Sequence, residues 1–216
     1  MKAAAGFSLV EGMLAMAIGL LVGLAGSRVF VAALHGWQAQ DVAARLQEDA
    51  RFALQRLARD IRMAGSFGCL RHQQIKFASP SAAHAFSNPV VLETGVDGSS
   101  HHLTLVSAQA GELGGAPDWT LVTDCQTSAR VSVGVAAPGK DAFAIPVRRQ
   151  VYRVSDGDLI LTSGGSNASL AANVSRFEVE RTGDLLKVNL TLRDPQQRVR
   201  EQRFFLAVAL RNGLSS

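Results

Sequence analysis

The side chains that could carry chemistry in this chain are few and widely spaced. Two of its five histidines, His101 and His102, are adjacent, and adjacent side chains of a strand point to opposite faces, so they could not readily share a metal ion. His35, His72 and His84 show no ligand-like spacing, and no nucleophile elbow, zinc-protease motif or phosphate-binding loop occurs. The sequence therefore predicts structural or surface roles for the histidines, no cofactor, no metal and no enzyme activity.

The two cysteines, Cys69 and Cys125, lie far apart in the sequence. No Cys-x-x-Cys or Cys/His pattern accompanies them, which argues against a structural zinc site. Two interpretations remain: a disulfide, if the protein folds in an oxidising compartment, or two unpaired buried thiols. The choice depends on the compartment, and the N-terminus carries the information about the compartment.

A single carboxylate, that of Glu11, interrupts an apolar N-terminal region. No charged residue occurs at positions 12–27. Residues 7–34 are long enough to cross a bilayer, which takes roughly 17–25 helical residues. A carboxylate at the centre of a membrane helix costs about 2.5–3.5 kcal/mol, and less near its edge, so a positive partner is expected. A free α-amino group at Phe7, produced by cleavage after Gly6, would supply this partner on a neighbouring subunit.

The sequence Gly6-Phe7-Ser8-Leu9-Val10-Glu11, followed by the apolar run, resembles the class III signal of type IV prepilins and secretion pseudopilins. The resemblance implies that a prepilin peptidase cleaves between Gly6 and Phe7 and methylates the new N-terminal Phe7. It also implies that Glu11 helps to register subunits in a filament. A secretory signal of the ordinary kind is not indicated, because no Ala-x-Ala cleavage site follows the apolar region.

Beyond residue 34 the sequence becomes amphipathic. Asp41 and Arg45 have the favourable i, i+4 order of a helix-surface ion pair. A single helix is therefore predicted from about Phe7 to Met63, with its first half in the membrane, its second half against a folded head, and a stop at Gly65. The apolar residues of the second half recur every three or four positions, the spacing of one helix face: Val42, Leu46, Ala50, Ala53, Leu57, Ile61 and Ala64.

The rest of the chain has the pattern of a β-rich head. Alternating residues predict strands at 103–106, 130–133, 150–154, 159–161, 177–180, 186–192 and about 199–210. The pair Asp156-Gly157 predicts a hairpin turn, and residues 182–184 predict a second one. Long loops are expected in the Gly-, Ser-, Ala- and Pro-rich region 79–138, and a flexible loop at 164–167. The predicted fold class is α+β: a long N-terminal helix, membrane-spanning in its first half, packed on a mainly antiparallel β-sheet head, as in pilins.

Residues 46–69 and 208–212 narrow the resemblance to PilW-type minor pilins, in which such a helix leads into an Ala-Gly-x-x-Gly-Cys turn. This implies a leader peptide (1–6), a hydrophobic transmembrane and filament-core helix (7–34), an amphipathic helix (35–64) and a periplasmic head (65–216). It implies a single-pass inner-membrane protein that later enters an extracellular pilus. With the head in the periplasm, a disulfide between Cys69 and Cys125 becomes the favoured interpretation.

The resemblance implies a minor pilin that takes part in the assembly or priming of a type IV pilus. Its expected partners are other minor and major pilins, the prepilin peptidase and the inner-membrane assembly platform. A J-type pseudopilin of type II secretion shares the same anchor and is the nearest alternative. A DNA-binding pilin of DNA uptake is a more distant one, because a net charge of +4 with scattered arginines favours a polyanion only weakly. Nucleic acid is not an expected partner.

Overall fold

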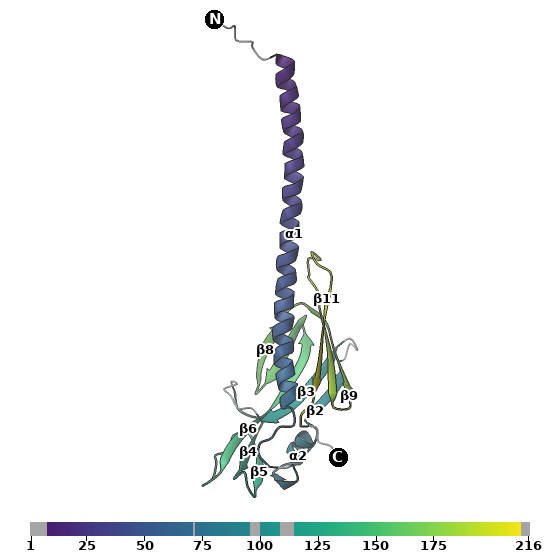
Figure 1. Cartoon of the computed structure of the whole chain (residues 1–216). Helices are drawn as coiled ribbons and strands as arrows, with labels where there is room; N and C mark the ends of the chain where they lie inside the picture. Colours follow the sequence, from purple (N-terminus) through teal and green to yellow (C-terminus); the bar gives the residue numbers. More distant parts are fainter. Residues whose placement is uncertain (1–7, 71, 96–99, 109–114, 213–216) are drawn as a thin grey trace. The chain divides into compact units, whose positions relative to one another are not determined.

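The computed structural model describes residues 8–70, 72–95, 100–108 and 115–212. The chain divides into two compact units, residues 1–45 and 46–216. The first unit contains most of one long helix, and the second contains the end of that helix together with all the strands. The fold is α+β with a long N-terminal helix, as predicted (Figure 1).

The helix α1 spans Leu9–Met63, 55 residues in one element. Its predicted start at Phe7 lies outside the described residues, and its predicted end at Met63 is confirmed. Asp41 and Arg45 form the predicted surface ion pair, with 3.0 Å between the two side chains. The apolar stripe of α1 becomes buried only in the second unit, where seven helix residues are buried: Leu46, Ala50, Ala53, Leu57, Ala58, Asp60 and Ile61.

The larger sheet has eight strands. Its main path runs β1-β5-β4-β6-β3-β2, and β7 and β8 extend it from β6. Strand β6 has 13 residues, long enough to pair with β4 at its start and with β3 and β7 further along. The bounds are β1 Ile75–Phe77 (after a short 3-10 helix, His72–Gln74), β2 Val90–Thr94, β3 His101–Ala108, β4 Trp119–Thr123, β5 Ala129–Val133, β6 Phe143–Ser155, β7 Asp158–Ser163 and β8 Ser166–Ala171.

The smaller sheet consists of three antiparallel strands in the order β11-β10-β9. They are β9 Val174–Thr182, β10 Leu185–Leu192 and β11 Gln202–Ala209, and the predicted turn at 182–184 joins β9 to β10. Leu186, Val188 and Leu190 on one face of β10 are fully buried, as expected for period-2 alternation over a core. His101 of β3 joins the two sheets, because its Nδ1 accepts a 2.8 Å hydrogen bond from the backbone N–H of Val179.

A short helix, α2 (Pro80–Ser87), packs against the larger sheet near β4 and β5 (Figure 1). The Ser79 side chain caps it by accepting a hydrogen bond from the N–H of Ala82. Phe86 of α2 is fully buried, stacks on Phe67 at 4.2 Å between ring centroids, and meets Trp119 edge-on at 5.9 Å. Such aromatic pairs contribute about 0.5–1.5 kcal/mol beyond the free energy gained by burying their surface. Helix α2 thus covers a small hydrophobic core.

One prediction about the head is incomplete and another is wrong. In region 79–138, expected to contain long loops, the strands predicted at 103–106 and 130–133 are confirmed as β3 and β5, and α2, β2 and β4 form where no element was predicted. Residues 164–167, expected to be a flexible loop, are a tight turn and the start of β8, since Ser166 pairs with Ser163 and Asn167 with Thr162. The head is mainly antiparallel as predicted, but β1 pairs with β5 in parallel.

Candidate functional site

The N-terminal carboxylate lies in the first turn of α1. The Glu11 side chain is exposed and makes no hydrogen bond or ion pair with any residue that the structure describes. A helix dipole favours a negative charge at this end by about 0.3–1 kcal/mol, which is less than the cost of an unpaired carboxylate in hydrocarbon. Glu11 therefore needs a cation from elsewhere if α1 enters a membrane. The predicted cleavage site, Gly6 and Phe7, lies outside the described residues.

Apart from Glu11 and Arg28, the first half of α1 is apolar on all its faces. Every large apolar side chain from Leu9 to Leu34 is exposed, with exposed fractions of 43–81%. A helix that is apolar all round requires an apolar surrounding, either a bilayer or other helices. Among the described residues, α1 is the one helix long and apolar enough to cross a membrane. Even the hydroxyl of Ser27 is paired within the helix, donating to the Gly23 carbonyl at 2.8 Å.

Asp60 links the second half of α1 to the larger sheet. Its Oδ2 accepts hydrogen bonds from Gln150 Nε2 at 2.9 Å and from the Tyr152 hydroxyl at 2.5 Å, both from β6. It also accepts one from Arg56 Nε at 2.8 Å, one helix turn away. Asp60 and both β6 side chains are buried. Buried hydrogen bonds to a charge are stronger than neutral ones, and here they join segments that are distant in the sequence.

The charges of this cluster are matched. Burial, and then the charge of Asp60, raise the pKa of the Tyr152 phenol far above its ordinary range, so Tyr152 remains a donor. Burial alone would lower the pKa of Arg56, but its hydrogen bond to Asp60 and the carboxylate charge outweigh burial and raise it. The cluster is thus an ion pair between a half-buried guanidinium and a buried carboxylate, and the neutral phenol and amide donate to the same carboxylate oxygen.

Hydrogen bonds of backbone groups also hold the end of α1 in place. Gly65 has a φ of +77°, and its N–H donates to the carbonyl of Val106 in β3 at 2.9 Å. The Asn212 side chain donates to the carbonyls of Arg62 and Ala64 at 3.3 and 3.4 Å, and so satisfies orphan acceptors of the last helical turn. A Cβ at position 65 would lie 2.6 Å from the Asn212 carbonyl oxygen, so only glycine fits there.

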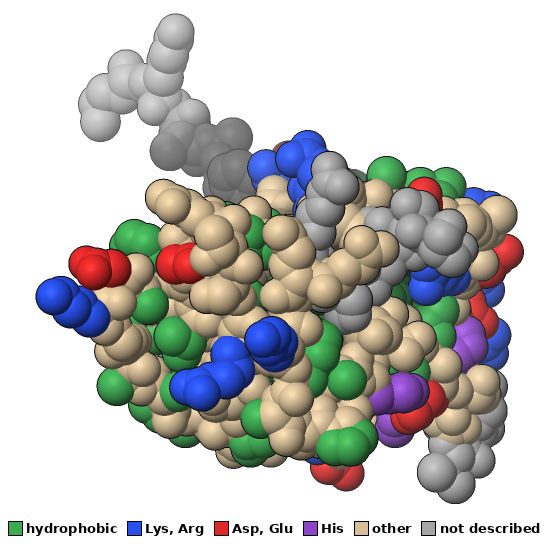
Figure 2. Space-filling model, turned by 90° about the horizontal axis from the view of Figure 1, so that it is seen from below, with side chains coloured by type: hydrophobic (Ala, Val, Ile, Leu, Met, Phe, Trp, Pro, Cys, Tyr) green, Lys and Arg blue, Asp and Glu red, His purple; other side chains and the backbone are tan. Residues whose placement is uncertain are grey.

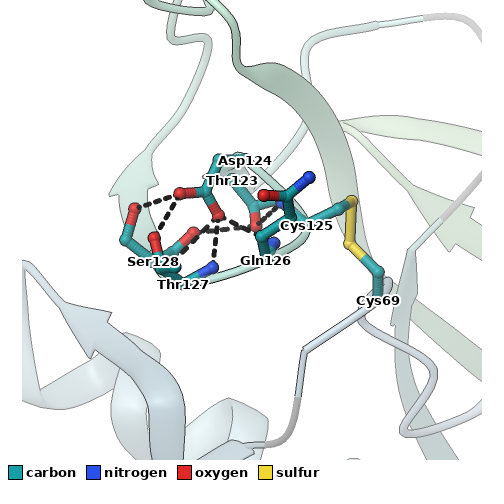
Figure 3. Close-up of a disulfide and its surroundings, with 7 residues drawn as sticks. All are labelled: Cys69, Thr123, Asp124, Cys125, Gln126, Thr127 and Ser128. Carbon is teal, nitrogen blue, oxygen red and sulfur yellow. Dashed lines mark hydrogen bonds between the residues drawn. A yellow bond between two sulfur atoms is a disulfide. The ribbon is translucent and has the colours of Figure 1, made fainter.

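Cys69 and Cys125 form a disulfide with their Cα atoms 5.3 Å apart, which confirms the predicted pairing (Figure 3). Cys125 lies in the β4–β5 turn with a φ of +60°, a conformation that costs a residue with a Cβ about 1–2 kcal/mol. The turn around it is ordered by Asp124, whose Oδ1 accepts hydrogen bonds from the N–H groups of Gln126, Thr127 and Ser128. The Ser128 N–H, the Thr127 hydroxyl and then the other N–H groups hold the pKa of Asp124 well below its ordinary value.

The remaining polar side chains do not converge on a catalytic or metal-binding geometry within the described residues. No group of three His, Cys, Asp or Glu there could hold a metal ion. His101 serves as a hydrogen-bond acceptor between sheets. Figure 2 shows one face of the molecule, on which Lys and Arg side chains occur in separate groups among apolar, acidic and histidine side chains. This face presents no continuous basic stripe of the kind that nucleic-acid binding uses.

Sequence reasoning identified the two cysteines and Glu11 but missed Asp60, Tyr152 and Asn212. A signal for Asp60 existed, because it lies three positions after Leu57 and so falls on the apolar face of the helix. Comparisons with protein-family models, curated proteins and solved structures find no match to this chain.

Proposed function

We propose that this chain is a minor pilin that takes part in the assembly or priming of a type IV pilus. The observation that carries the proposal is the isolated carboxylate of Glu11 at the start of a helix whose first half, apart from Arg28, is otherwise apolar on every face. Such a helix suits a bilayer before assembly and a bundle of neighbouring helices afterwards, since both surroundings are apolar.

In this proposal the prepilin peptidase cleaves between Gly6 and Phe7 and methylates Phe7. Cleavage converts an amide into a cationic α-amino group at the start of the apolar run. That amine pairs with Glu11 of the same or a neighbouring subunit, so the carboxylate is compensated inside the filament. The pairing selects one axial register between helices, because any other register leaves a charge unpaired in an apolar bundle.

Before assembly, α1 anchors the chain in the inner membrane with the head in the periplasm. The Cys69–Cys125 disulfide supports this side of the membrane, because disulfides persist in oxidising compartments such as the periplasm. Other minor pilins, the major pilin and the inner-membrane assembly platform are the proposed partners. A membrane-anchored chain with one apolar helix reaches them by lateral diffusion and helix packing.

The test is the amount of surface pili sheared from a strain that lacks this chain, with type II secretion measured in parallel. Loss of pili with normal secretion, restored by the wild-type gene, is the expected result. Normal pili with blocked secretion would overturn the proposal in favour of a pseudopilin of the J type. Normal pili together with normal secretion would overturn both assignments.

A further inference from the structure

The outer edge of β11 is open. β11 is the last strand of the smaller sheet and pairs only with β10 among the residues that the structure describes. Every second residue of such an edge presents an N–H and a C=O group outside the sheet. The opposite edge strand, β9, differs, because its outward N–H at Val179 bonds to His101 and its N–H at Val174 bonds to the Gly157 carbonyl.

This edge lacks the devices that usually protect one. In natural proteins, charges, prolines, bulges or a covering segment prevent an edge strand from pairing with another strand. β11 has the sequence Gln-Arg-Phe-Phe-Leu-Ala-Val-Ala, with one charge at its beginning and no proline. Its register with β10 is continuous over all eight pairs, without a bulge. Phe205 in its middle is 62% exposed. The edge is thus long, regular and apolar, which are the properties of a strand that accepts another strand.

A groove runs along this edge. It has a volume of about 610 Å³ and lies between β11 and the part of α1 that belongs to the second unit. Leu54 and Ala58 of the helix and Phe204 and Leu206 of β11 give it an apolar lining. An extended peptide in the groove would find backbone partners on one side and apolar side chains on the other.

The charged residues that line the groove are all basic. Arg51 and Arg62 line it on the helix, and no acidic residue does. Neither guanidinium makes an ion pair or hydrogen bond with a described residue. The two arginines are 11 positions apart, which is about 16 Å along a helix with a rise of about 1.5 Å per residue. About five residues of a strand, at roughly 3.3 Å each, cover that length.

We propose that the β11 edge groove binds an extended segment of a partner protein, which adds to β11 as a fourth strand of the smaller sheet. The segment presents apolar side chains to Leu54 and Ala58. It carries two carboxylates, four or six residues apart and so on the same face, that pair with Arg51 and Arg62. The inference rests on the head alone and does not depend on the proposed pilus function.

The test uses the full chain in non-ionic detergent micelles and a designed probe. The probe is a capped, fluorescein-labelled peptide of eight residues, with threonine at odd positions, glutamate at the second and sixth, and valine at the fourth and eighth. We expect saturable binding by fluorescence anisotropy, together with slower exchange of those amides of residues 202–209 whose N–H points away from β10. A peptide with lysine in place of both glutamates should bind about tenfold more weakly or worse, since it meets like charges.

Matched variants locate the site. Phe205→Lys places a charge on the open edge, and Phe143→Lys makes the same change at a side chain that is also 62% exposed but lies on β6. Arg51→Glu reverses a charge of the groove, and Arg59→Glu reverses an exposed helix charge outside its lining. We expect the first variant of each pair to weaken peptide binding about tenfold or more, and the second to leave it within about twofold.

Several outcomes would overturn the proposal. These are an absence of saturable binding, equal binding of the lysine peptide, or equal losses within each pair of variants. Peptide binding without slower exchange in β11 would also overturn it, because strand addition must protect those amides. If the chain dimerises and Phe205→Lys abolishes the dimer, the segment that adds to β11 comes from a second copy of the chain and not from a partner protein. If Phe205→Lys fails to fold, judged by circular dichroism, the Arg51→Glu and Arg59→Glu pair decides alone.

Discussion

Asp60 and Tyr152 are 92 positions apart in the sequence, and a buried hydrogen bond of 2.5 Å joins the tyrosine hydroxyl to the carboxylate. Asp60 belongs to α1 and Tyr152 to β6, so this bond fixes the second half of the helix to the larger sheet. The same oxygen also serves Gln150 and Arg56, which makes the carboxylate the common acceptor of three donors. The cluster is a direct polar link between the helix and the larger sheet.

Tyr152→Phe should destabilise the head by about 1–3 kcal/mol, because it removes a donor from a buried charge without removing the charge. The measurement is urea denaturation of the full chain in non-ionic detergent, followed by the fluorescence of buried Trp119. Ser169→Ala is the control, since it deletes a hydroxyl that bonds to Asp158 at the surface. It should cost less than about 0.5 kcal/mol. Similar losses in both variants would show that the Asp60 cluster contributes no more than a surface contact.

Gly65→Ala should be more destabilising than Gly157→Ala. Both glycines have a left-handed backbone, with φ of +77° and +80°, so both substitutions carry about 1–2 kcal/mol of backbone strain. Only at position 65 does the added methyl collide with another backbone, 2.6 Å from the Asn212 carbonyl oxygen. The difference between the two free energies of unfolding isolates that collision. Equal losses would mean that the Asn212 segment moves aside freely.

Replacing both Cys69 and Cys125 by serine should lower the free energy of unfolding by about 2–4 kcal/mol, because the bridge closes a long loop in the unfolded chain. The sequence separation of the two cysteines is 56. Dithiothreitol should lower the stability of the wild type toward that of the double variant, and should not affect the variant. A wild type that is insensitive to the reductant under unfolding conditions would contradict the prediction.

Asp194→Asn should abolish part of the acid sensitivity of the head. Hydrogen bonds from the Arg198 side chain, and next from the N–H groups of Arg198 and Gln196, hold the pKa of Asp194 below its ordinary value of 3.8. The unfolded chain therefore takes up this proton at a higher pH than the folded one. The resulting stability is present above about pH 4 and is lost as the pH falls further. Urea denaturation at pH 7 and at pH 3 should show that the wild type loses more stability between the two pH values than the variant does. If the two proteins differ in stability by the same amount at both pH values, the prediction is refuted.

Glu11→Val should leave membrane insertion intact and reduce entry into filaments about tenfold, the effect of losing roughly 1.4 kcal/mol from a binding equilibrium. The readouts are carbonate extraction of membranes and the amount of chain in sheared pili. Glu48→Val makes the same substitution outside the apolar region and should not affect filament entry. If the Glu11 variant enters filaments as well as the wild type does, this carboxylate does not set the register of subunits.

Local signals in the sequence account for the elements that were predicted correctly. The end of α1 follows from Gly65, and the hairpins follow from Asp156-Gly157 and residues 182–184, because turn chemistry acts over a few residues. The helix α2 was missed although Ser79 and Pro80 form a cap-and-proline start, because the helix has only eight residues. Strand β8 was missed because its Ser- and Asn-rich sequence has no apolar alternation and depends on pairing with β7.

The contacts that the sequence could not supply are those between distant segments. Nothing near Asp60 indicates that Gln150 and Tyr152 will meet it, and nothing near Arg62 indicates Asn212. The open edge of β11 likewise depends on the order of strands in the smaller sheet, which pairing decides and local pattern does not. The cysteine pairing could be predicted because the chain contains only two.

The Cys69–Cys125 bridge also has a mechanical consequence. A pull along the chain from α1 toward β11 passes from Cys69 to Cys125 through the covalent bond and bypasses everything between them. The bypassed stretch spans a sequence separation of 56, and at about 3.4 Å per extended residue it would otherwise release roughly 190 Å of slack. Helix α2 and strands β1 to β4 lie inside this closed loop. They are thus shielded from load, and the chain under tension can lengthen only through its helix and the strands after the bridge.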